Sequence, residues 1–147
     1  MSIINLQGIT KIYRTKEVET VALENVNLEV EKGDFLSVMG PSGCGKSTML
    51  NIMGLLDVAT NGKVLINGTE TNRMKDKEMA EFRNKTLGFV FQSFNLLGRT
   101  SALENVELPL VYRKIPTIKR KELALEALTK VGLQSVVNNT PAQLSGG

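Results

Sequence analysis

The 147-residue sequence contains no histidine, no tryptophan and a single cysteine. Without histidine, no imidazole group can act as a catalytic base, and Cys44 has no partner for an intramolecular disulfide. No apolar run approaches the roughly 20 residues that span a bilayer, and residues 1–7 lack the charged leader and apolar core of a secretory signal. If the protein serves a membrane, we expect it to do so from the cytoplasmic side, through a partner.

Neither sign of charge dominates. Eighteen basic and 15 acidic residues give a net charge of +3, and the densest basic cluster, at residues 119–121, is followed directly by Glu122, as on a solvated helix face. This excess is too small and too dispersed to indicate nucleic-acid binding, so no nucleic-acid partner is expected. Hydrophobic residues at 41% and charged residues at 22% are ordinary for a globular protein, and the length suits one compact domain.

The first 98 residues carry the pattern of an α/β core with an antiparallel side sheet. Apolar and polar residues alternate over residues 26–30, which is typical of a strand with one buried face. Phe35–Met39 and Leu87–Phe91 are almost wholly apolar, which predicts strands covered on both faces. We expect strands over residues 3–13, 18–30, 35–39, 63–66 and 87–91, and helices over residues 47–56 and 76–84.

After residue 98 the pattern predicts a small helical subdomain. Ser101 and Glu104 have the spacing of a capping box at the start of a helix. Pro109 should kink or end that helix, and a second helix is expected from about Thr117. The predicted organisation is a core subdomain over residues 1–98 and a helical subdomain over residues 99–147.

A glycine-rich segment before the helix at 47–56 fits the phosphate-loop (Walker A) pattern G-x-x-x-x-G-K-[ST]. Main-chain amides can surround a triphosphate only where side chains leave room, which glycines provide. The N-terminus of the following helix adds roughly half a positive charge. Lys46 supplies a full charge for the β- and γ-phosphates, and the Ser47 hydroxyl can ligate Mg²⁺. The nucleotide-binding residues predicted here are Gly40, Pro41, Ser42, Gly43, Cys44, Gly45, Lys46, Ser47 and Thr48.

Three segments occur in the order and approximate spacing of ABC transporter ATPases: the loop at 40–48, FVFQ at 89–92 and LSGG at 144–147. The sequence resembles that family over its entire length. LSGG alone indicates only a flexible loop, but it is highly specific downstream of a Walker A loop and a Q-loop. The resemblance implies an α/β fold, with a P-loop NTPase core, an antiparallel β side sheet and a small α-helical subdomain. It also implies that ATP and Mg²⁺ are the cofactors.

The resemblance further implies roles for individual residues. Tyr13 matches the aromatic residue that stacks on adenine, a contact worth about 1–3 kcal/mol per base; simple packing at a strand end is the alternative. Gln92 matches the Q-loop glutamine that approaches Mg²⁺ and water and links the site to the membrane partner. Ser145, Gly146 and Gly147 are expected to contact the γ-phosphate of ATP held by the opposite subunit, because small residues let the loop close over phosphate.

A finer likeness, over residues 91–97 and 102–110, is to the bacterial branch that serves lipoprotein release and macrolide export, with some peptide exporters. We therefore expect the ATP-binding subunit of a bacterial ABC transporter, peripheral on the cytoplasmic face of the cell membrane. Its expected partners are a transmembrane permease subunit and a second nucleotide-binding domain in a homodimer. The alternative is a regulatory ATPase of the cell-division type, which signals through a membrane partner without transport.

The family also needs a Walker B strand and a switch histidine downstream of the signature motif. Neither is found in residues 1–147, so we expect an incomplete (truncated) ABC ATPase domain whose parent is an ATPase. By itself the chain should bind nucleotide weakly and not turn it over. The missing strand would lie beside Phe35–Met39, so the apolar surface there is expected to cause aggregation or pairing with another copy.

Overall fold

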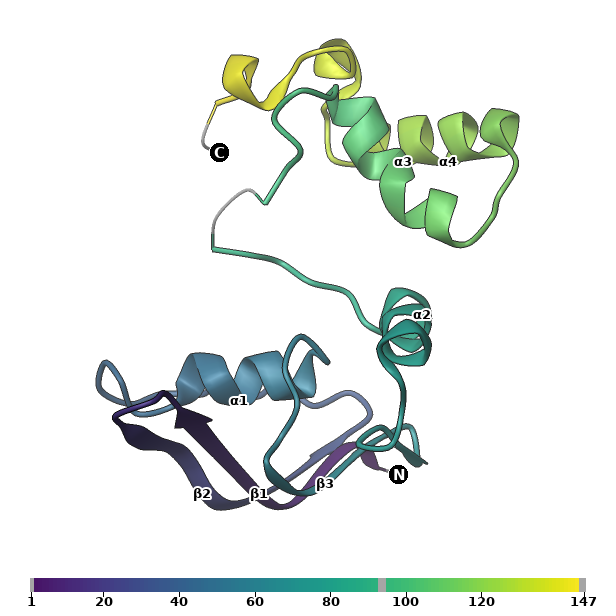
Figure 1. The fold of residues 1–147 in the computed structure, drawn as a ribbon. Helices are drawn as coiled ribbons and strands as arrows, with labels where there is room; N and C mark the ends of the chain where they lie inside the picture. The colour runs from purple at the N-terminus through teal and green to yellow at the C-terminus, as the bar shows by residue number, and fades with distance from the viewer. Residues whose placement is uncertain (1, 93–94, 146–147) are drawn as a thin grey trace. The chain divides into compact units, whose positions relative to one another are not determined.

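The computed structural model describes residues 2–92 and 95–145. The chain divides into two compact units, Met1–Arg83 and Asn84–Gly147. The first contains a β-sheet with helices, and the second is helical (Figure 1). Within the described ranges, no helix combines the length and the apolar character needed to cross a membrane.

The first unit is built on a four-stranded antiparallel sheet in the order β2-β1-β3-β4. Two long strands at its N-terminus and a shorter third strand confirm the strands expected over residues 3–13, 18–30 and 63–66. The strands are β1 (Ser2–Arg14), β2 (Glu19–Glu31), β3 (Asn61–Ile66) and β4 (Thr69–Glu70).

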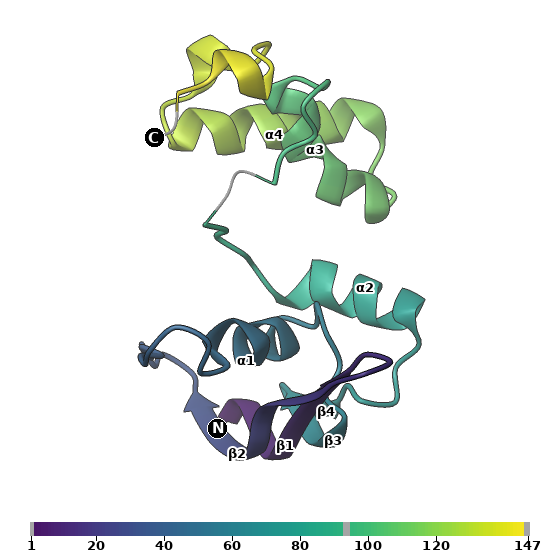
Figure 2. The same ribbon diagram turned by 60° about the vertical axis from the view of Figure 1, so that its left-hand side comes forward.

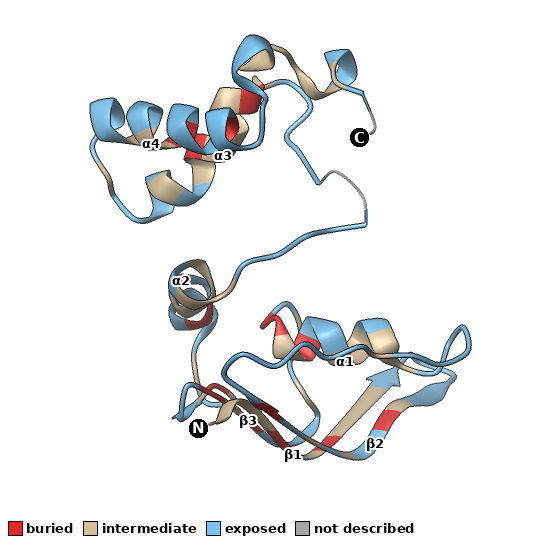
Figure 3. Ribbon diagram, turned by 180° about the vertical axis from the view of Figure 1, so that it is seen from behind, coloured by how far each residue is buried: buried red, intermediate tan, exposed pale blue. Residues whose placement is uncertain are grey.

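The core of this unit lies between the sheet and α1 (Lys46–Met53), which crosses one face of the sheet (Figures 1 and 2). The helix α2 (Asp76–Thr86) adds one buried residue to this core. Full burial of a large apolar side chain contributes about 1.5–3 kcal/mol, so the cluster fixes α1 and the loop before it. The buried apolar side chains are those of Leu6, Ile9, Leu23, Val30, Ile52, Leu55, Val64, Ile66 and Met79 (Figure 3).

Two expected strands do not form. Phe35–Met39 and Leu87–Phe91 have no strand structure, and Phe35 is 99% exposed and Val90 104%. An apolar run indicates only that a segment has faces to bury, whereas a strand also needs neighbouring backbones at its edges. Among the described residues, no strand pairs with either segment, and that is why the prediction of two buried strands is wrong here.

The second unit contains two packed helices and two short 3-10 turns. Ala124 and Leu128, both on the second of these helices, are buried. Glu107, only 7% exposed, lies 3.5 Å from Nε of Arg120 and forms an ion pair across the two helices. The elements are α3 (Ala102–Tyr112), α4 (Thr117–Lys130), η1 (Gln134–Val136) and η2 (Pro141–Gln143).

The start of α3 has the predicted capping box. The backbone amide of Glu104 donates to Oγ of Ser101 at 3.2 Å, and the amide of Ser101 donates to Oε2 of Glu104 at 2.7 Å. Each side chain therefore satisfies an amide that the helix leaves unpaired. Pro109 lies within α3 rather than at its end, and the helix stops three residues later at Tyr112. The missing N–H of Pro109 costs one helical hydrogen bond near a terminus.

Candidate functional site

The glycine-rich loop leads directly into α1, as the sequence predicts. Gly45 is the residue before the helix and has a φ of 92°. A Cβ atom on residue 45 would lie 2.5 Å from the carbonyl oxygen of Ala22 and 2.8 Å from Cδ2 of Leu23. Only glycine combines this backbone conformation with so close an approach to β2. The loop is thereby seated against the sheet at a defined point.

Lys46 points its ammonium group back into the loop. Nζ donates hydrogen bonds to the carbonyl oxygens of Gly40, at 2.8 Å, and Pro41, at 2.6 Å. Nζ also lies 3.6 Å from Sγ of Cys44, and the Cys44 amide donates to the Pro41 carbonyl at 3.4 Å. The turn thus wraps around a full positive charge.

Charge and geometry make this loop suited to an anion. The first amide groups of α1 have no acceptor within the helix and carry about half a positive charge. There is no acidic residue in the first turn of α1 to oppose them. Residues 41–43 and Ser47 are exposed, so a polyphosphate can reach them. The residues present therefore fit the phosphate group that the sequence predicts.

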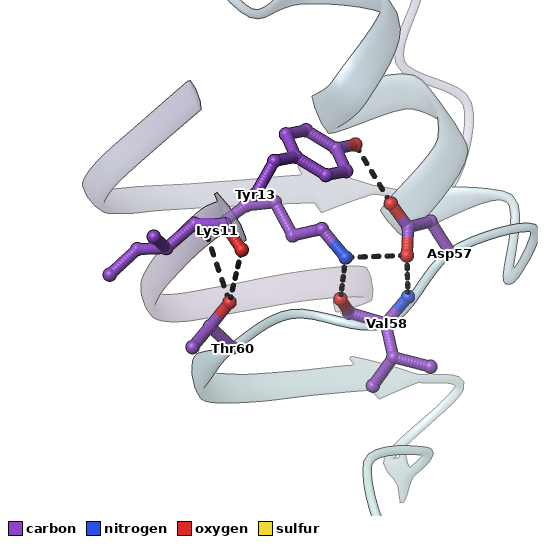
Figure 4. Close-up of polar contacts among 6 residues, drawn as sticks. Lys11, Tyr13, Asp57, Val58 and Thr60 are labelled. Carbon is purple, nitrogen blue, oxygen red and sulfur yellow. Dashed lines mark hydrogen bonds and ion pairs between the residues drawn. The ribbon is translucent and has the colours of Figure 1, made fainter. Parts of the chain in front are cut away.

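Tyr13 lies near the end of β1 and is joined to the loop that follows α1 (Figure 4). Its hydroxyl donates to Oδ2 of Asp57 at 2.9 Å. Nζ of Lys11 donates to Oδ1 of the same carboxylate at 2.6 Å and to the Val58 carbonyl at 2.8 Å. The Lys11 ammonium also lies over the tyrosine ring, 4.8 Å from its centroid. Tyr13 remains 43% exposed.

Asp57 is ionised over a wide pH range. Burial alone would raise the pKa of this carboxyl group. Hydrogen bonds from Lys11, from Tyr13 and from the Val58 amide, together with the charge of Lys11, outweigh burial and lower the pKa below its usual value. The carboxylate is therefore available as a charged acceptor for both Lys11 and Tyr13 at neutral pH.

Tyr13 and the glycine-rich loop lie close together along the sheet. Tyr13 pairs with Thr20 of β2, and Gly45 rests against Ala22 of the same strand. Two residues along a strand span roughly 7 Å, and neighbouring strands are roughly 5 Å apart. The Tyr13 ring and the glycine-rich loop therefore lie in one unit, the ring on β1 and the loop against the neighbouring strand β2.

The remaining predicted site residues belong to the second unit. Gln92 is exposed in a bend after the irregular segment 87–91, and Ser145 is exposed after η2. The predicted residues Gly146 and Gly147 lie outside the described residues. Tyr13 and residues 40–48 therefore lie in the first unit, and Gln92 and Ser145 lie in the second.

Lys11 and Asp57 are two site residues that sequence reasoning missed. Lys11 precedes Tyr13 by two positions, a spacing that in a regular strand places two side chains on the same face. The pairing of β1 with β2 is irregular at Lys11, but the two side chains are in contact. Asp57 is 46 residues away from Lys11, and no sequence pattern connects them. Across residues 2–92 and 95–145, no group of three or more His, Cys, Asp or Glu side chains is arranged to hold a metal ion.

Comparisons with known proteins place this loop in a family. The model of the family described as ABC transporter matches residues 23–147. An uncharacterised ABC transporter ATP-binding protein of Thermotoga maritima is 50% identical over 145 residues, which are 99% of this chain and 62% of that protein. A macrolide export ATP-binding/permease protein, MacB, of Hyphomonas neptunium is 42% identical over 145 residues, which are 99% of this chain and 22% of that protein.

A solved structure agrees with these sequence matches. It is a dimeric, post-hydrolysis state of the ATP-binding cassette MJ0796, from Methanocaldococcus jannaschii, bound to ADP and Pi. It superposes with a TM-score of 0.88 at 46% identity, over 97% of this chain and 63% of that one. The chain belongs to the ABC transporter family of ATP-binding proteins. It spans 62% of the Thermotoga maritima protein and 63% of the MJ0796 chain, which is less than two thirds of each.

Proposed function

We propose that the protein is the ATP-binding subunit of a bacterial ABC transporter, which couples ATP binding and hydrolysis to transport by a membrane partner. The observation that carries the proposal is the loop at residues 40–48, which wraps around the Lys46 ammonium at the start of α1. A loop of bare amides with one fixed cation is an arrangement that binds polyphosphate. The MJ0796 cassette, bound to ADP and Pi, supports a nucleotide as the ligand.

Each part of the nucleotide has a matching part of the protein. The loop amides and Lys46 bind the phosphates, and Tyr13 stacks on the adenine. Mg²⁺, held with the help of Ser47 and Gln92, would neutralise phosphate charge. Ser47 is exposed in the first turn of α1, so its hydroxyl is accessible to a bound Mg²⁺.

We assign the functional subdomains as residues 1–98 and 99–147. The segment from residue 84 to 98 is grouped with the ATP-binding core because Gln92 acts on the nucleotide. The helical subdomain ends in the signature motif, Ser145 to Gly147, which contacts ATP on the opposite subunit. The dimeric state named for MJ0796 supports a pair of such domains as the working unit.

The membrane partner is a permease, and it keeps the protein at the cytoplasmic face of the membrane. A permease joined to an ATP-binding domain is named in the MacB relative, which is a macrolide exporter. For this protein we propose a cargo of the lipoprotein, macrolide or peptide type. Affinity purification from cells, with the permease identified by mass spectrometry and transport measured in vesicles, tests this; a partner whose activity involves no cargo would favour the regulatory alternative.

The 147 residues by themselves are proposed to bind ATP without turnover. Their sequence includes no histidine and no Walker B segment that could orient the attacking water. A malachite-green phosphate assay should detect no release above buffer, while a fluorescent ATP analogue should bind saturably and be displaced by ATP. Steady phosphate release by this chain would contradict the proposal on turnover, and absence of displaceable binding would contradict the proposed function.

A further inference from the structure

The loop that follows α1 is attached on both sides. At the end of α1, the Asn51 carbonyl accepts hydrogen bonds from the amides of Leu56, at 2.8 Å, and Asp57, at 3.2 Å. At the sheet, Oγ1 of Thr60 accepts a hydrogen bond from the amide of Ile12 at 3.0 Å. The loop that carries Asp57 is therefore attached to both the helix and β1, and its carboxylate faces Lys11 and Tyr13 (Figure 4).

The same helix thus supports two places that a nucleotide would contact. Its N-terminus begins at Lys46, within the phosphate loop. The loop after its C-terminus carries Asp57, which accepts the hydrogen bond from the Tyr13 hydroxyl at 2.9 Å. Asp57 and the tyrosine hydroxyl therefore meet beyond one end of α1, and the phosphate loop lies at the other end.

Lys11 restrains the ring from a second direction. Its ammonium lies over the ring, 4.8 Å from the centroid, and is held by Oδ1 of Asp57 and the Val58 carbonyl. A cation over one face of an aromatic ring is an attractive contact, and it leaves the opposite face as the one that can accept a base. Tyr13 as a whole is 43% exposed.

We propose that Lys11 and Asp57 are positioning residues that hold Tyr13 in the orientation for stacking on the nucleotide base. This inference rests on the proposed nucleotide binding, and it deepens it by naming the residues that prepare the base subsite. Restraining a flexible side chain before binding removes an ordering cost of about 0.5–1.5 kcal/mol. Loss of the restraint should therefore weaken binding of ATP by about 3- to 10-fold.

The main experiment compares ATP with inorganic tripolyphosphate, which has no base, by isothermal titration of the protein. Asp57→Asn and Lys11→Met should each lower the affinity for ATP about 3- to 10-fold and leave tripolyphosphate binding unchanged. Tyr13→Phe, which keeps the ring and loses the hydroxyl, should behave like Asp57→Asn. The double variant Asp57→Asn with Tyr13→Phe should be no weaker than either single variant, because both substitutions act on the contact between the Tyr13 hydroxyl and the Asp57 carboxylate. Lys130→Met, which breaks the ion pair of Lys130 with Glu126, is the matched control and should bind both ligands normally.

A spectroscopic readout reports the ring itself. The chain has two tyrosines and no tryptophan, so Tyr112→Phe leaves Tyr13 as the sole strong emitter. A carboxylate that accepts a hydrogen bond from the phenol quenches tyrosine emission. In the Tyr112→Phe protein, adding Asp57→Asn should therefore raise the tyrosine emission measured without nucleotide. ATP should quench the emission of this double variant less completely than it quenches the emission of Tyr112→Phe alone.

The outcomes separate this inference from the function on which it rests. If Tyr13→Ala leaves ATP binding unchanged relative to tripolyphosphate, the stacking role fails, and the positioning role fails with it. If Tyr13→Ala weakens ATP alone while Asp57→Asn and Lys11→Met bind ATP normally, only the positioning role is overturned. If those two variants weaken tripolyphosphate as much as ATP, the network supports the fold rather than the base subsite, and the inference is again overturned.

Discussion

Gly45 approaches Ala22 so closely that a Cβ atom at position 45 would lie 2.5 Å from the Ala22 carbonyl oxygen. This approach is where the phosphate loop is seated on β2, 23 positions earlier in the chain. A larger residue at position 45 would have to push the loop away from the sheet or deform β2. Position 45 therefore requires glycine for two reasons: the positive φ of the backbone and the lack of space beside Ala22.

Gly45→Ala should destabilise the protein more than the same substitution at a glycine that has a positive φ but free space around it. Gly33 is the matched control, because its φ is 96° and a Cβ there would meet nothing within 4 Å. Gly33→Ala should cost about 1–2 kcal/mol of unfolding free energy, and Gly45→Ala about 1–3 kcal/mol more from the clash. Urea unfolding followed by circular dichroism measures both; equal losses would mean that the contact with Ala22 constrains nothing.

The ion pair of Asp57 predicts a pH dependence of stability. Hydrogen bonds and the charge of Lys11 lower the folded-state pKa of Asp57 in spite of burial. A lowered pKa stabilises the folded state above the unfolded pKa of about 3.9, and that contribution is lost as the pH falls through the folded pKa. With a partly exposed pair, we expect about 0.2–1 kcal/mol.

The measurement compares the wild type with Asp57→Asn in urea between pH 2.5 and pH 7. The wild type should be the more stable protein at neutral pH, and the difference should disappear at the acid end. Other carboxylates titrate equally in both proteins, so the difference isolates Asp57. A gap between the two that stays constant down to pH 2.5 would contradict the assignment of the shift.

The exposed apolar segments predict self-association of the 147-residue chain. Phe35 is 99% exposed, Met39 85% and Val90 104%, so each unit presents an exposed apolar segment, and exposed apolar surface promotes association between molecules. Size-exclusion chromatography with light scattering should find species heavier than 16.1 kDa. The double substitution Phe35→Ser with Val90→Ser should shift them toward monomer. Monomeric wild-type protein at the same concentration would refute this prediction.

Local patterns predict the parts of the fold whose causes are local. The β1–β2 hairpin, the start of α1 after the glycine-rich loop and the Ser101–Glu104 capping box all follow from spacings of a few residues. The segment at residues 35–39 shows the limit, because its hydrophobicity indicates burial but not whether neighbouring strands are there to pair with it.

The candidate site also contains residues that local sequence predicts and residues that it does not. The glycines and lysine of residues 40–48 are predictable because the chemistry of phosphate binding requires them within nine positions. The contact of Lys11 with Asp57 is not, since 46 residues separate them and their meeting depends on how α1 lies on the sheet. Contacts of this kind depend on tertiary packing, which no short sequence window contains.

The most direct test of the account is a calorimetric titration with ATP and with tripolyphosphate of the wild type and of Lys46→Met. Removing the ammonium group should weaken both ligands about 10- to 100-fold, because charge-assisted hydrogen bonds to phosphate are lost. Lys77→Met, at an exposed position of α2, is the control and should bind both ligands like the wild type. Undiminished binding of tripolyphosphate by Lys46→Met would contradict the claim that residues 40–48 form the phosphate site.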